Sequence, residues 1–292
     1  MADKPSRALV LFGDGLAPLI GPEHTHLHSV ASKAVCGFLS LPNAPPSESE
    51  DERIVREFAL LLDALDAYPI SGNEGQPERP SIPPMGERFT SMKAGLVTDH
   101  AGLISFAKKL GLLVGGLTKG SNGLLGTLGF GDDKTYEKNL DVAFVHTGAG
   151  EILDCDIEHV NNVVGDILEK AQRCSNIGSC LHLSVVMSYG KISADSDTHL
   201  SVLRPKSEEE SNLSKLFPRQ SYTMRGEHPR DNVRHHCPML IAQWQNAVTR
   251  RDTVETFSFE DFKERGANLV IPADRFVHEV AFKVWKAPKY GA

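Results

Sequence analysis

The sequence has few cysteines, no long apolar run and no excess of positive charge. Its five cysteines are an odd number without a C-x-x-C pair, so they indicate neither a disulfide framework nor a zinc finger (Cys36, Cys155, Cys174, Cys180 and Cys237). The first apolar run, Ala8–Phe12, is far shorter than a membrane span or the apolar part of a signal peptide, and Asp14 follows it closely. We therefore expect a protein of a reducing compartment, the cytoplasm or the nucleus, with no membrane partner.

The charge balance limits the class of partner. The chain carries 31 Lys and Arg residues against 38 Asp and Glu residues, a formal net charge of -7, and no basic stripe offsets this acidic excess. A general affinity for phosphate backbones is therefore not expected, and nucleic acid is excluded as a predicted partner. At 292 residues and 40% hydrophobic content, the chain is long and apolar enough to bury a substantial core.

Short apolar runs alternate with helical patterns, which is typical of an α/β protein with a largely parallel sheet and helices on both faces. One predicted helix has its apolar stripe from Ile54 to Leu65, a second from Ile157 to Leu168, and a third spans Arg275–Trp285. The predicted strands are Ala8–Phe12, Ala94–Thr98, Leu112–Leu117, Val142–His146, Leu183–Ser188 and Met239–Trp244.

Two stretches lack this periodicity. Residues 69–89 are rich in Pro, Gly, Glu and Ser, as a surface connection would be. Residues 189–236 are long, polar and charged, and include the acidic run S-E-E-E-S at 207–211. We predict a flexible loop in each place, within a single domain that spans 1–292.

Two motifs have both a structural and a chemical interpretation. Asp14 follows the first strand in L-F-G-D-G, which places a carboxylate at the carboxyl edge of the sheet, although Asp-Gly is also a common turn. Ser47 precedes an amphipathic helix in P-P-S-E-S-E-D, where Ser47 with Glu50, or Ser49 with Glu52, fits a capping box. A hydroxyl at a helix N-terminus is also well placed to attack or hold a phosphoryl group, so both roles stay open.

In their order along the chain these segments resemble the alkaline phosphatase superfamily, and within it the cofactor-independent phosphoglycerate mutases. L-F-G-D-G is similar to that family's first metal-ligand segment, and P-P-S-E-S to the region around its nucleophile. The run D-V-A-F-V-H-T-G-A-G-E, followed by I-E-H-V-N-N-V-V-G-D-I-L, resembles its F-V-H-x-x-A-x-D-E-x-G-H segment and the next helix. R-H-H-C-P-M-L-I and F-S-F-E-D-F-K-E-R-G-A-N-L-V-I-P extend the resemblance almost to the end of the chain.

The resemblance implies a serine nucleophile at Ser47 and a site for divalent metal ions. It assigns Asp14 and Glu151 to metal ligands, and His235 or His236 to the last metal histidine, while Asp154 and Asp156 are possible substitutes for lost ligands. The sequence departs from the family at two ligand positions, because Cys155 stands where a histidine belongs and Ser188-Tyr189 where the family has an Asp-His pair. The connection at 69–89 also stands where the family inserts a cap domain, and mutase chemistry needs a closed site.

Two hypotheses of different classes follow. The first is a degenerate phosphatase-like domain that has lost normal catalysis and acts as a binding or scaffold protein, with the 189–236 loop as its protein-binding surface. The second is a metal-dependent phosphomonoesterase with an altered site, which takes a phosphorylated small molecule as substrate. We expect no cofactor in the first case and one divalent ion (Mn, Zn or Mg) in the second. An unrelated α/β protein is the third alternative.

Overall fold

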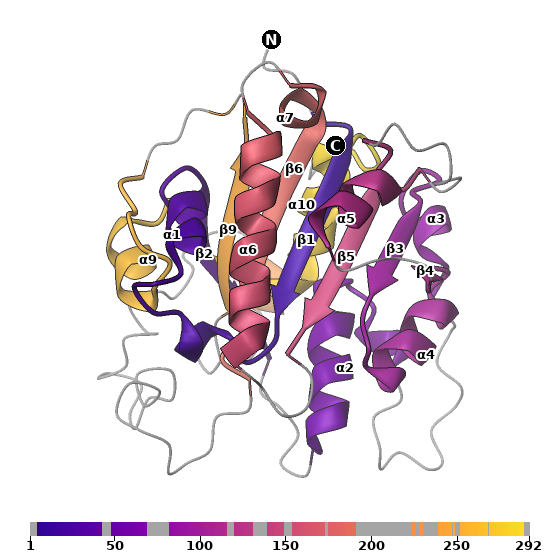
Figure 1. Cartoon of the computed structure of the whole chain (residues 1–292). Helices are drawn as coiled ribbons and strands as arrows, with labels where there is room; N and C mark the ends of the chain where they lie inside the picture. The colour runs from indigo at the N-terminus through magenta and orange to yellow at the C-terminus, as the bar shows by residue number, and fades with distance from the viewer. Residues whose placement is uncertain are drawn as a thin grey trace.

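A computed structural model describes residues 5–42, 48–68, 82–115, 120–130, 139–148, 154–172, 175–190, 224–225, 228–229, 239–246, 248, 252–267 and 269–288. Its centre is an eight-stranded sheet in the order β10-β2-β9-β6-β1-β5-β3-β4 (Figure 1). Only β9 runs antiparallel to its neighbours in this sheet. The sheet strands are β1 Arg7–Gly13, β2 Val35–Ser40, β3 Ala94–Val97, β4 Leu113–Val114, β5 Val142–Thr147, β6 Leu181–Met187, β9 Met239–Gln245 and β10 Leu269–Pro272.

Helices cover both faces of this sheet, because successive side chains of a strand point to opposite faces. In β1, Leu9 and Leu11 pack in one apolar core and Ala8, Val10 and Phe12 in the other. The first core is closed by α1 Thr25–Ala31, α5 Ser121–Thr127, α6 Asp154–Lys170 and α9 Phe259–Arg265. The second is closed by α2 Glu50–Leu61, α3 Met85–Arg88, α4 Ala101–Lys109 and α10 Phe276–Lys283. A further short helix, α7, spans Asn176–Cys180 and precedes β6.

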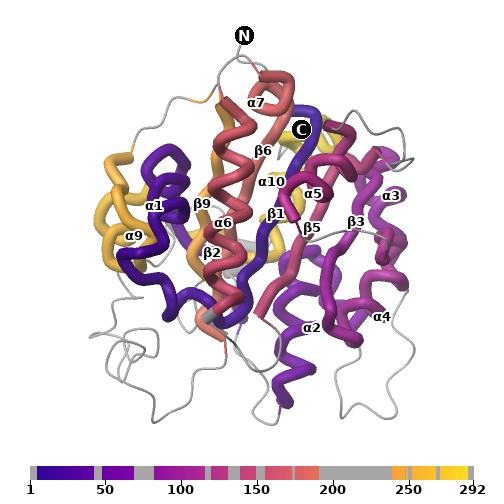
Figure 2. The backbone as a smooth tube through the Cα atoms, viewed as in Figure 1, coloured from indigo at the N-terminus to yellow at the C-terminus, as the bar shows by residue number. Residues whose placement is uncertain are grey.

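The strands that surround β1 all end at the same edge. β1 pairs in parallel with β5 and β6, so that Gly13 lies opposite Thr147 on one side and Met187 on the other. Figure 2 shows α2 beyond the carboxyl ends of β1 and β5, in line with the strands. The residues that follow these strands and those of the first turns of α2 therefore share one region.

The predicted fold class is confirmed, and each of the six predicted strands is present. The apolar stripe from Ile54 to Leu65 gives α2 and the turn after it, and the stripe from Ile157 to Leu168 gives α6. Two strands of the eight-stranded sheet, β2 and β10, were not predicted. Gly37 divides the first into short apolar pieces, and the second is four residues long and ends in proline, so neither has a clear strand pattern.

The two predicted loops lie mostly outside the described residues. α3 forms near the end of the 69–89 stretch, and the short strands β7 Met224–Arg225 and β8 His228–Pro229 pair with each other within 189–236. The absence of a cap domain stays a prediction. Among the described helices, none is long and apolar enough to cross a membrane.

Candidate functional site

Asp14 lies directly after β1 and is completely buried. Its backbone N–H donates to the carbonyl of Thr147 at 2.8 Å, so the turn after β1 is held against the end of β5. Gly148, with a φ of 99°, allows this close approach, because a methyl group there would overlap the carbonyl oxygen of Asp14. The prediction that Asp14 lies at the carboxyl edge of the sheet is confirmed.

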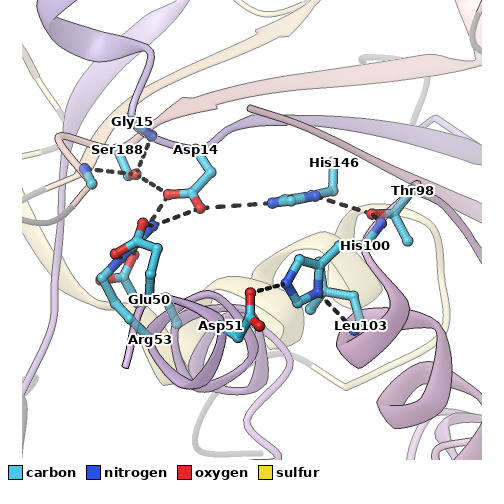
Figure 3. Close-up of polar contacts among 12 residues, drawn as sticks. Asp14, Gly15, Glu50, Asp51, Arg53, Thr98, His100, Leu103, His146 and Ser188 are labelled. Carbon is cyan, nitrogen blue, oxygen red and sulfur yellow. Dashed lines mark hydrogen bonds and ion pairs between the residues drawn. The ribbon is translucent and has the colours of Figure 1, made fainter. Parts of the chain in front are cut away.

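Arg53 in α2 binds both oxygens of this carboxylate (Figure 3). Its Nη1 donates to Oδ1 of Asp14 at 3.0 Å and its Nη2 to Oδ2 at 2.8 Å, a bidentate pair in which the Arg53 side chain is only 7% exposed. The same guanidinium also bonds Glu57 at 2.9 Å and Glu50 at 2.6 Å. One positive group therefore serves three carboxylates.

The position of Arg53 follows from how α2 begins. Ser49 is the N-cap and forms a capping box with Glu52, so the helix starts at Glu50 and its first turn brings Arg53 toward the sheet edge. The sequence allowed a capping box either of Ser47 with Glu50 or of Ser49 with Glu52. The structure confirms the one of Ser49 with Glu52. An apolar neighbour, Phe58, packs against Phe12 of β1 and fixes the helix there.

Ser188 bonds Asp14 from the other side. Its hydroxyl donates to Oδ1 of Asp14 at 2.8 Å and accepts from the backbone N–H groups of Gly15 and Gly190 at 2.9 and 3.2 Å. This serine stands where the resemblance places the aspartate of an Asp-His pair. In this structure it binds the carboxylate of Asp14.

A histidine completes the surroundings of Asp14. His146, at the end of β5, is 2% exposed, and its Nε2 lies 3.8 Å from Oδ2 of Asp14. That nitrogen has no hydrogen-bond partner among the described residues, whereas Nδ1 lies 3.1 Å from the hydroxyl of Thr98. Because a carboxylate faces Nε2, the tautomer with its proton on Nε2 is favoured.

A second histidine caps the neighbouring helix. Nδ1 of His100 accepts the backbone N–H of Leu103 at 3.2 Å, which makes His100 the N-cap of α4. Its Nε2 therefore carries the proton and donates to Oδ1 of Asp51 at 3.1 Å. Both ring nitrogens are thus engaged, and His100 has a structural role in this arrangement.

The charges of the site are set by burial and by Arg53. Burial by itself raises the pKa of Asp14, but the neighbouring His146 and the hydrogen bonds and charge of Arg53 outweigh it and lower the pKa to about 2. Burial lowers the pKa of Arg53, but its hydrogen bonds to Glu50 and Asp14 raise this pKa by more than burial lowers it. Arg53 therefore stays charged. Burial and the negative charge of Asp14 raise the pKa of Glu57 to about 7, although the charges of Arg53 and Arg56 act in the opposite direction.

A cleft of about 540 Å³ opens beside this buried group. Its polar lining comes from α2, from the loop after β3, from the end of β5 and from the first turn of α6 (Asp51, Glu52, Thr98, Asp99, His100, His146, Thr147 and Asp156). The volume is within the usual range of roughly 300–1,000 Å³ for small-molecule sites. The buried pair of Asp14 and Arg53 is not part of its lining.

Several predicted site residues lie outside the described residues, namely Ser47, Glu151, His235 and His236. Asp154 begins α6, but its side chain is not described. Asp156 lies in the same turn and lines the cleft, while Cys155 is exposed. Ser47 as nucleophile and the predicted metal ligands therefore stay predictions, except for the position of Asp14 described above.

The described residues do not fit a divalent ion at Asp14. A carboxylate offers about four acceptor sites, and three of them receive hydrogen bonds from Arg53 and Ser188. The guanidinium supplies the positive charge that a metal ion would supply. Within the described ranges, no three His, Cys, Asp or Glu side chains are grouped so that they could hold an ion.

Arg53, His146 and Thr98 were not identified from the sequence. Arg53 follows three acidic residues at the start of a helix, a pattern typical of a solvated helix end, and its partner is 39 residues away. His146 did carry a signal, because it ends a predicted strand beside the strand before Asp14. Side chains that follow parallel strands meet at one sheet edge, and this rule would have found it.

The sequence matches no protein-family model and no curated protein. Two solved structures are similar over almost the whole chain. The PH0037 protein from Pyrococcus horikoshii has a TM-score of 0.52 at 13% identity, with all of both chains covered. A cofactor-independent phosphoglycerate mutase from Thermoplasma acidophilum has a TM-score of 0.50 at 11% identity, with 96% of this chain and 100% of the mutase covered. The fold is therefore alkaline-phosphatase-like, of the kind found in cofactor-independent phosphoglycerate mutases.

Proposed function

We propose that this chain is a binding or scaffold protein built on an alkaline-phosphatase-like core, without normal metal-dependent phosphoryl transfer. The observation that supports this most directly is the bidentate pair of Arg53 with Asp14, the carboxylate that the family resemblance assigns to a metal ion. Ser188 supports it too, because a hydroxyl bonded to Asp14 replaces a metal-binding pair.

The electrostatics of phosphoryl transfer explain why this matters. A phosphate monoester carries nearly two negative charges, and the transition state needs cations against the phosphoryl oxygens and the attacking group. The charge of Arg53 is already directed to Asp14, Glu57 and Glu50. Little of it is left for an incoming phosphate.

A second function is supported by the cleft. A phosphomonoesterase with an altered site would need a space for its substrate, and the volume of about 540 Å³ beside His146 and His100 is large enough for a small phosphorylated molecule. In that case Ser47 would attack phosphorus, and one divalent ion would be bound by Glu151 with Asp154 or Asp156, and by His235 or His236. Only the first function includes a protein partner that binds residues 189–236.

An assay separates the two functions. Turnover of p-nitrophenyl phosphate and of phosphoglycerates is measured with Mn²⁺, Zn²⁺, Mg²⁺ and Co²⁺, in the unmodified protein and in Ser47→Ala. The proposed function predicts equal background rates in both proteins with every metal. Metal-dependent turnover that disappears in Ser47→Ala would establish the phosphomonoesterase instead.

A further inference from the structure

We propose that Arg53 is a built-in cation that occupies the place of a metal ion at Asp14, and that its removal opens a latent divalent-metal site formed with His146. This deepens the proposed function and rests on it in one respect, since both require that the unmodified protein holds no metal ion at Asp14. The site differs from the predicted metal site in its members, because neither Arg53 nor His146 was among the predicted residues.

The first argument is the distance between the two remaining ligands. Nε2 of His146 lies 3.8 Å from Oδ2 of Asp14 and has no hydrogen-bond partner among the described residues. Bonds from zinc to nitrogen or oxygen are about 2.0–2.2 Å long, so two ligands of one ion lie at most about 4.3 Å apart. The two atoms already have a separation that one ion could bridge, although they are too far apart to bond each other directly.

The second argument is the orientation of the imidazole. A ligating histidine usually donates its other ring N–H to an oxygen, which fixes the ring. Nδ1 of His146 lies 3.1 Å from the Thr98 hydroxyl, which can accept that proton once Nε2 binds an ion. The backbone N–H of His100 donates to the same hydroxyl at 3.1 Å and holds it in place.

The third argument is charge. Asp14 is fully buried and depends on Arg53 for close neutralisation, while Glu57, which is 5% exposed, is shared between Arg53 and Arg56. Glu50 bonds the same guanidinium from the rim of the site. Without Arg53 the carboxylate of Asp14 would be left uncompensated in a poorly solvated place, a situation that strongly favours the uptake of another cation.

The test compares variants by metal content and metal affinity. Arg53→Ala removes the cation, whereas Arg53→Lys keeps a positive charge in the same place. Arg88→Ala is the matched control, because Arg88 is a half-buried arginine of α3 that bonds Asp63 away from this site. Each protein is equilibrated with Zn²⁺ or Mn²⁺ and desalted, its bound metal is measured by mass spectrometry, and its affinity is measured by calorimetry.

We expect about one ion per chain in Arg53→Ala and none bound stoichiometrically at this site in the unmodified protein, in Arg53→Lys or in Arg88→Ala. The gained ion should be lost again in Arg53→Ala combined with Asp14→Asn or with His146→Ala. A folded Arg53→Ala protein that gains no ion would overturn the proposal. An ion in the unmodified protein that Asp14→Asn removes would overturn it as well.

A second measurement covers the case in which Arg53→Ala does not fold without metal. Arg53→Ala and Arg53→Gln are then titrated with Zn²⁺ while circular dichroism reports folding. Folding that depends on both the metal and His146 supports the latent site, and failure of both variants to fold at millimolar metal overturns it. These readouts do not involve turnover, so the latent site can fail while an inactive protein still supports the proposed function.

Discussion

Ser188 donates a hydrogen bond to Oδ1 of Asp14 at 2.8 Å and so connects two strand ends that are 174 residues apart in the chain. The hydroxyl is buried and also accepts two backbone N–H groups. In the family that this chain resembles, a metal-binding pair stands at this position. Here the residue joins β6 to β1, which is a structural role at the place where a catalytic one is expected.

Ser188→Ala should therefore lower stability. Asp14 loses one hydrogen bond, and the N–H groups of Gly15 and Gly190 lose an acceptor, so we expect the free energy of unfolding to fall by about 1–3 kcal/mol. Urea denaturation measures this. Ser179→Ala is the control, because that hydroxyl is exposed, and its effect should stay within about 0.5 kcal/mol. Equal effects of the two substitutions would contradict the role assigned to Ser188.

The close approach of Gly148 to Asp14 gives a second prediction. Gly148→Ala should destabilise the protein in two ways, through its φ of 99° and through overlap of the new methyl group with the Asp14 carbonyl oxygen. Gly115 is a matched control, since its φ is 89° but, apart from its chain neighbours, no atom of the described residues lies within 4 Å of an added methyl group. We expect roughly 1–2 kcal/mol for Gly115→Ala, and a clearly larger loss for Gly148→Ala, measured by thermal and urea unfolding. Similar losses would show that the turn adapts to the methyl group.

The fold could be predicted from the sequence because its signals are local. The apolar runs of β1 and β5 and the stripe of α6 each reveal themselves within a few residues. The missed strands show the limit of this method. β2 and β10 pair with each other at one end of the sheet, and partners distant in sequence, rather than their own short patterns, decide that they are strands.

The site was predictable only in part, for the same reason. Asp14 follows a clear strand, so its place at the sheet edge could be inferred. Arg53 could not be assigned, because a charged residue in the first turn of a helix is normally solvated, and its burial depends on contact with Asp14. The sequence therefore indicated which ligand positions of the resembled family are changed here, but not which cation lies against Asp14.

The capping box of α2 is directly testable. Ser49→Ala removes the side chain that accepts the N–H of Glu52, and the N-terminal turn that carries Arg53 should fray. We expect a loss of about 0.5–2 kcal/mol in the free energy of unfolding, whereas Ser49→Asp, which can cap in the same way, should lose little. Equal stability of both variants and the unmodified protein would show that packing alone fixes the start of α2.

The buried Glu57 should make stability depend on pH in a defined direction. Its pKa is raised from an ordinary 4.5 to about 7, so between these values the unfolded chain releases a proton that the folded chain retains. The contribution of Glu57 is therefore complete below about pH 4.5 and is lost as the pH rises through 7. Asp14 acts in the opposite sense, because its lowered pKa places its loss between about pH 4 and 2, outside the range used here.

Glu57→Gln tests this direction, because glutamine resembles the protonated acid at every pH. We expect the free energy of unfolding of Glu57→Gln, relative to the unmodified protein, to increase by roughly 1–3 kcal/mol between pH 5 and pH 8. Urea denaturation at several pH values measures the difference, and Glu169→Gln on the exposed side of α6 is the control. A difference that stays constant with pH would mean that Arg53 and Arg56, which face Glu57, keep it ionised throughout this range, and that burial is the weaker effect at this position.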